Sequence, residues 1–113
     1  MIGLDERTMN YAISVRQYVK SLNKSQYNQD DMIQLIRSSG SVGANYIEAN
    51  ECLSKKDFIY RIKICLKEAK ESRYWLKVIR KSNNIYQNEE TNILIEESTQ
   101  IIRIFSSIVN KSK

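Results

Sequence analysis

Apolar side chains return every three or four residues along most of the chain, and no proline interrupts them. The 113 residues include no proline and only three glycines. Because proline breaks a helix and glycine weakens one, this composition favours long α-helices. No segment shows the polar–apolar alternation that is typical of a strand. The sequence therefore predicts an all-α protein, and its length predicts a single domain over residues 1–113.

This repeat predicts four amphipathic segments, which are separated by short polar stretches. We predict helices over about residues 5–25, 30–53, 54–82 and 88–110. In the second segment, one core row runs from Leu35 to Leu53 at spacings of four and three. Four such segments with short connections predict an antiparallel up-down-up-down four-helix bundle.

Two local signals refine this prediction. Gly40 and Gly43 lie inside the second segment, where each glycine costs about 1 kcal/mol relative to alanine. Close approach of another backbone would offset that cost, so we expect this to be either the most tightly packed or the most kinked part of the bundle. Ser54, followed three residues later by Asp57, predicts a cap at the start of the third segment.

Positive charge is concentrated in the third segment. The chain has 18 Lys and Arg against 13 Asp and Glu, a net charge of +5. Residues 55–81 hold ten basic and three acidic residues, an excess of seven, so the other 86 residues carry a net charge of −2. Six lysines and two tyrosines share one side of this helix, nearly opposite its apolar stripe. We call this set the lysine row: Lys56, Tyr60, Lys63, Lys67, Lys70, Tyr74, Lys77 and Lys81.

The lysine row has the properties of a nucleic-acid-binding surface. It is about 37 Å long at the standard helical rise. Lysines in line can meet a run of phosphates, and the tyrosine rings are available for base stacking. The alternative is a solvated basic face with no ligand. We expect contact with RNA or DNA through these eight residues.

A third sector of the same segment is apolar but lies off the core stripe. It contains Ile64, Trp75 and Val78. A monomer would leave this patch in water, and contiguous apolar patches usually mark partners. We therefore expect these residues to form a homo-oligomer interface. The alternative is that Trp75 packs on a neighbouring helix of its own chain.

The sequence offers little for catalysis or metal binding. Histidine is absent, which excludes imidazole acid–base chemistry and histidine-ligated metals. Two Glu-x-x-Glu pairs are present, but dinuclear sites in bundles usually add histidines. We therefore expect Glu48 and Glu71 to pair with Arg37, Arg73 or lysines near helix ends. The four carboxylates are Glu48, Glu51, Glu68 and Glu71. We predict no catalytic residue, no metal and no cofactor.

The expected compartment is the cytoplasm. The N-terminus lacks the basic and apolar regions of a signal peptide, and no stretch approaches the roughly 18 apolar residues of a membrane span. We therefore expect no membrane association. Cys52 and Cys65 are predicted to be small core residues in a reducing environment, with a disulfide or regulatory thiol as the alternative.

Three blocks of the sequence resemble a known bacterial family. Residues 37–49 read Arg-Ser-Ser-Gly-Ser-Val-Gly-Ala-Asn-Tyr-Ile-Glu-Ala, residues 54–59 read Ser-Lys-Lys-Asp-Phe-Ile, and residues 66–76 read Leu-Lys-Glu-Ala-Lys-Glu-Ser-Arg-Tyr-Trp-Leu. With their spacing, they resemble the four helix bundle protein family, also called the 23S rRNA intervening sequence protein family. Many relatives have proline in place of Gly43 and glycine in place of Ala49, which bears on helix bending.

The resemblance implies an antiparallel bundle that assembles as a homopentamer, and it carries over no catalytic residue. The accessory variability determinant proteins of diversity-generating retroelements look similar. They form a basic, nucleic-acid-binding pentamer that engages a reverse transcriptase. We therefore predict a non-enzymatic homo-oligomer that binds RNA or DNA. An oligomeric scaffold that binds another protein, with no nucleic-acid role, is the alternative.

Overall fold

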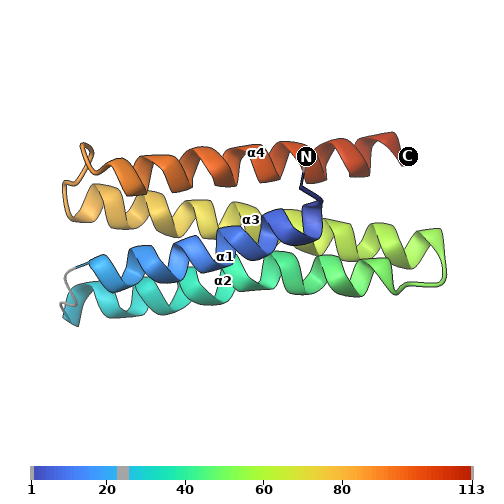
Figure 1. Cartoon of the computed structure of the whole chain (residues 1–113), viewed down its shortest axis with the longest axis horizontal. Helices are drawn as coiled ribbons and strands as arrows, with labels where there is room; N and C mark the ends of the chain where they lie inside the picture. The colour runs from blue at the N-terminus through green and yellow to red at the C-terminus, as the bar shows by residue number, and fades with distance from the viewer. Residues whose placement is uncertain (1, 23–25, 113) are drawn as a thin grey trace.

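Four α-helices make up the bundle, in a computed structural model that describes residues 2–22 and 26–112. They are α1 (Leu4–Ser21), α2 (Gln26–Asn50), α3 (Lys55–Ser82) and α4 (Glu89–Lys111), and these described residues contain no strand. The helices run along a rod of 45 × 23 × 21 Å (Figure 1). Neighbours in the chain pack side by side, and α4 closes the ring against α1. This arrangement confirms the predicted four-helix bundle.

The core forms where the apolar stripes of all four helices meet. Burying one large aliphatic or aromatic side chain contributes about 1.5–3 kcal/mol, so these rows supply most of the stability. The pair α2–α3 packs most extensively and the pair α1–α4 least. The largest fully buried apolar side chains are Tyr11, Tyr18, Phe105, Leu35, Ile62, Leu76, Ile79, Ile101, Val15 and Val42.

The α1–α2 connection differs from the prediction. Helix α1 ends at Ser21 rather than near residue 25, and residues 23–25 lie outside the described part of the chain. Helix α2 begins at Gln26, four residues earlier than predicted. Asn28 is buried and exchanges side-chain amide hydrogen bonds of 3.1 and 2.9 Å with Asn83. This polar stretch is thus helical from Gln26, and Asn28 in its first turn is hydrogen-bonded to the end of α3.

The end of α2 also differs. The helix stops at Asn50, and Leu53, predicted to close the core row, is fully exposed. The N–H groups of Glu51 and Cys52 donate to carbonyls three residues back, which tightens the last turn and moves Leu53 off the row. The side chain of Ser54 then caps α3 by accepting from the Asp57 N–H at 3.1 Å, as predicted.

Gly43 allows α1 to approach α2 closely. A Cβ at Gly43 would lie 2.9 Å from Thr8 Oγ1 and 3.3 Å from Thr8 Cβ, and Thr8 is itself buried. At Gly40 the near atom is Arg16 Nη2 at 3.0 Å, the far end of a flexible side chain. The expected close approach is therefore confirmed, and Gly43 is the position that requires glycine.

These two glycines give opposite predictions for substitution by alanine. Gly40→Ala should raise the free energy of unfolding by roughly 0.5–1 kcal/mol, because helix propensity improves and Arg16 can move. Gly43→Ala should lower it by about 1 kcal/mol, because overpacking against Thr8 outweighs that gain. Urea unfolding followed by circular dichroism measures both. Equal effects of the two changes would contradict the close approach at Gly43.

Buried hydroxyl groups link α1 to the other helices. Tyr11 Oη lies 2.7 Å from Ser72 Oγ on α3, and Tyr18 Oη lies 2.7 Å from Thr91 Oγ1 on α4. Burial raises the pKa of Tyr11 to about 12, although the hydrogen bond to Ser72 opposes the shift. Burial likewise raises the pKa of the Cys65 thiol, which lies in the core, to about 12.

Alkali should therefore unfold the protein by ionising buried groups. In the folded protein, the pKa values of Cys65 and Tyr11 lie above their ordinary values of 9.0 and 10.0, respectively. The stabilisation that comes from burying both groups in their neutral forms is therefore complete below pH 9 and is lost as the pH rises towards 12. Tyr11→Phe should reduce the loss of unfolding free energy between pH 10 and 12 by about 2 kcal/mol. Tyr60→Phe, at an exposed tyrosine, is the control. An identical pH profile for Tyr11→Phe and the parent would contradict this account.

Candidate nucleic-acid interface

All eight members of the lysine row lie on the outer side of α3. Their side chains are exposed, with Tyr60 at 63% and Tyr74 at 58%. Ile62, Cys65 and Ala69 are fully buried on the opposite side of the same helix. The helix runs without a break for 28 residues, so the row is continuous. The structure therefore places together every residue that the spacing assigned to this face.

The ion pairs of the described residues use arginines and leave the lysines out. They join Arg7 to Glu97, Arg37 to Glu68 and Glu71, and Arg61 to Glu48. Lys67 is one turn from Glu71, and its charge helps to lower the pKa of that carboxyl. No lysine of the row lies within 4 Å of a carboxylate among the described residues, so these ammonium groups are exposed without an ion-pair partner there.

Arg37 explains why the carboxylates of α3 do not neutralise the row. Its Nη1 donates to Glu68 Oε2 at 2.9 Å, and its Nη2 donates to Glu71 Oε2. Trp75 Nε1 donates to the same Glu71 oxygen at 3.1 Å. Burial disfavours ionisation of Glu71, but these hydrogen bonds and the nearby cations lower its pKa overall. Two of the three acidic residues of α3 are thus held by α2.

The ion pairs show which partners the four glutamates of the two Glu-x-x-Glu pairs have. The predicted pairing of Glu71 with Arg37 is confirmed, and Arg37 also pairs with Glu68, for which the sequence predicted no partner. Glu48 instead pairs with Arg61 at 2.8 Å, a partner that the sequence did not suggest. Glu51 is exposed just beyond the end of α2. Within residues 2–22 and 26–112, no group of three or more acidic or cysteine residues gathers as a metal site.

The predicted interface residues lie along the outer flank of α3. Ile64, Trp75 and Val78 are each half-buried. Trp75 packs partly against the core of its own chain, and its ring meets Tyr74 edge-on, with ring centroids 5.0 Å apart. These residues are therefore less open to a partner than the sequence indicated, although each keeps some accessible surface.

Four apolar side chains that the sequence did not single out as an interface are exposed on α1 and α2. Met9, Ile13, Ile33 and Ile47 are 45–57% exposed. Met9 and Ile13 are two residues away from the buried Tyr11, which places them on the far side of α1. Their spacing of two residues from Tyr11, a core residue, already indicated in the sequence that they lie opposite the core. We call these four residues the α1–α2 apolar face.

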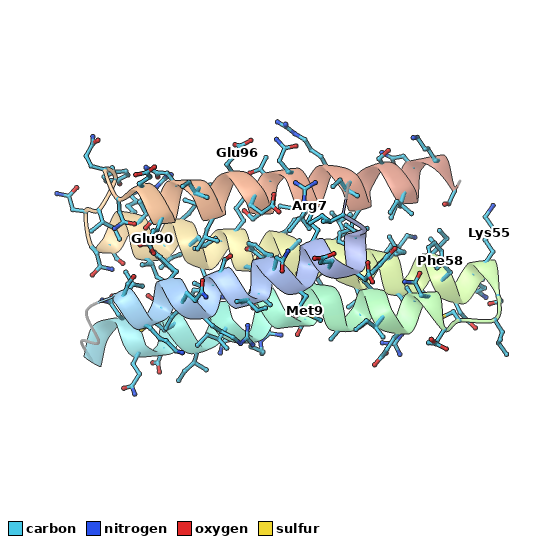
Figure 2. All side chains as sticks on the ribbon, viewed as in Figure 1. Arg7, Met9, Lys55, Phe58, Glu90 and Glu96 are labelled. Atoms are coloured by element: carbon cyan, nitrogen blue, oxygen red, sulfur yellow. The ribbon has the colours of Figure 1, made fainter. Side chains whose placement is uncertain are left out.

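A groove lies at the first turns of α3, beside the end of α4. It has a volume of about 550 Å³. Figure 2 shows Lys55 extending from this end of the bundle into solvent. The groove is lined by Lys55, Lys56, Ile59, Tyr60, Lys63 and Ser112. Three members of the lysine row thus share a concave surface with Lys55, which the spacing rule did not include.

Comparison with known proteins places this geometry in a family. The model of the family described as "23S rRNA-intervening sequence protein" matches residues 5–107. A crystal structure from Bacteroides thetaiotaomicron, described as a protein of unknown function from the S23 ribosomal protein family, is similar at a TM-score of 0.84. It is 31% identical, and the match covers 95% of this chain and 98% of that one. No curated protein matches significantly. No helix in the described ranges has the length and apolar character needed to cross a membrane.

Proposed function

The chain belongs to the 23S rRNA-intervening sequence protein family, and on that basis we propose that it is a non-enzymatic, homo-oligomeric module that binds RNA or DNA. This family is not a known class of enzymes. The observation that carries the proposal is the lysine row, six exposed lysines in line and outside the ion pairs of the described residues. Binding rests on phosphates, so it depends strongly on salt and weakly on sequence.

Charge reversal within the row should weaken nucleic-acid binding. Lys67→Glu with Lys70→Glu should lower affinity for labelled RNA by at least about tenfold at 50 mM salt, because both contacts become repulsive. If four to six phosphates are contacted, log K should fall with log[salt] at a slope of about −3 to −4 for a single strand. Fluorescence anisotropy at several salt concentrations measures both quantities.

A charge-matched variant controls for net charge. Lys20→Glu with Arg103→Glu makes the same change of four charge units at exposed positions on α1 and α4. Its affinity should stay within about threefold of the parent, because long-range effects of distant exposed charges are largely screened. Equal weakening by both double variants, or no binding by the parent at 50 mM salt, would refute the proposal.

A homo-oligomer would carry one lysine row on each copy of the chain. We assign the α1–α2 apolar face to the contact between copies, since its side chains are the more exposed apolar set, with Ile64, Trp75 and Val78 as the other candidate surface. Large exposed apolar patches usually mark partner sites. The resemblance to known pentamers sets the expected number of copies at five.

Light scattering tests the assembly. We expect a mass of about five times the 13.3 kDa of one chain. Ile13→Lys with Ile47→Lys should reduce this mass, because two charges would be buried in the contact. Val78→Lys tests the flank of α3 in the same way. A parent mass near that of a single chain at micromolar concentration would exclude the assembly.

The second candidate function is an oligomeric scaffold for another protein. The partly exposed flank of α3 with Ile64, Trp75 and Val78 favours it, since the α1–α2 apolar face is assigned to the contact between copies. In that case the lysines serve only solubility. Affinity capture from lysate before and after nuclease treatment distinguishes the two functions. A protein partner that stays bound after nuclease treatment, together with RNA affinity that does not change in Lys67→Glu with Lys70→Glu, would favour the scaffold.

A further inference from the structure

We propose that the lysine row selects single-stranded nucleic acid by stacking unpaired bases on Tyr60 and Tyr74; this inference rests on the proposed function and specifies its ligand. The two tyrosines are the most exposed aromatic side chains described. They lie on the same side of α3, 14 residues or about 21 Å apart. Lysines lie between and beyond them, so rings and ammonium groups alternate along one line.

Tyr60 forms one wall of the groove at the first turns of α3. Lys55, Lys56 and Lys63 also line this groove, whose volume of about 550 Å³ lies within the range of small-molecule sites, roughly 300–1,000 Å³. An unpaired base can lie against the Tyr60 ring while its phosphates meet the surrounding lysines. A flat basic helix would offer charge alone, whereas this groove adds a concave surface with an aromatic wall.

Tyr74 provides the second stacking position, and a contact with Trp75 orients its ring. Its ring meets Trp75 edge-on, with an interplanar angle of 77°. Trp75 is itself fixed by the hydrogen bond from its indole N–H to Glu71, and Glu71 is held by Arg37. A ring that is already oriented loses less conformational freedom on binding, which favours affinity. The ion pair across α2 and α3 therefore positions a stacking surface.

A duplex cannot use these two tyrosines. In a duplex the bases are stacked inside, and each strand winds about the axis while it advances about 3.4 Å per phosphate. A straight row of lysines then meets a given strand only over a short length. A single strand can lie along α3 and expose its bases to both rings, and each stacked base can raise affinity roughly tenfold.

Binding of matched probes tests the inference. The probes are a labelled 12-nucleotide RNA, the DNA of the same mixed sequence, and the corresponding duplexes, each titrated at 100 mM salt. We expect the parent to bind a single strand at least about tenfold more tightly than a duplex. Tyr60→Ala with Tyr74→Ala should remove most of that preference and leave duplex affinity within about twofold. The RNA and DNA arms show which backbone is preferred.

Two controls make the result specific. Tyr60→Phe with Tyr74→Phe keeps both rings and should keep the single-strand preference. Tyr86→Ala removes an exposed tyrosine outside the row and should leave single-strand affinity unchanged. Equal affinity for strand and duplex, or no effect of the alanine pair while Lys67→Glu with Lys70→Glu weakens binding, would overturn the inference and leave the proposed function intact. Absence of binding to every probe would refute the proposed function itself.

Discussion

The guanidinium of Arg37 fixes two carboxylates of α3 on the side that faces α2. It reaches from α2 to two carboxylates of α3, and one of them, on Glu68, is only 6% exposed. A buried carboxylate is strongly unfavourable unless it is paired and hydrogen-bonded, so Glu68 depends on this partner. Because Arg37 also engages Glu71, and Glu71 orients Trp75, one side chain joins two helices, positions an aromatic ring and withholds negative charge from the lysine row.

The sides of α3 differ in what they contact. One side of α3 supplies fully buried core residues such as Ile62 and Leu76. One flank carries the contacts to Arg37, and the outer side carries the lysines. Since the outer side contributes little to packing, its side chains can change with little effect on stability. Loss of Arg37 would instead disturb both the α2–α3 contact and the orientation of Trp75.

Periodicity in the sequence predicted the bundle and the lysine row, because both depend only on the geometry of a single helix. The start of α2 could not be predicted in this way, since Asn28 is paired with Asn83, which lies 55 residues further along the chain. The position of Leu53 depended on where α2 stops. On α2, Ile47 is apolar but 55% exposed, since the position of α1 decides which apolar residues of that helix are buried. The predicted antiparallel order places the end of α4 beside the start of α3, but the period of a single helix cannot specify the lining of the Tyr60 groove between them.

Lysine acetylation footprinting, read by mass spectrometry, tests most directly whether the lysine row is the surface that nucleic acid covers. In the free protein, Lys63, Lys67, Lys70 and Lys77 should react readily, since all four are exposed. A saturating single-stranded RNA should protect these four and leave Lys20, on α1, reactive. Protection spread evenly over all lysines, or Lys63, Lys67 and Lys70 that do not react in the free protein, would contradict the account.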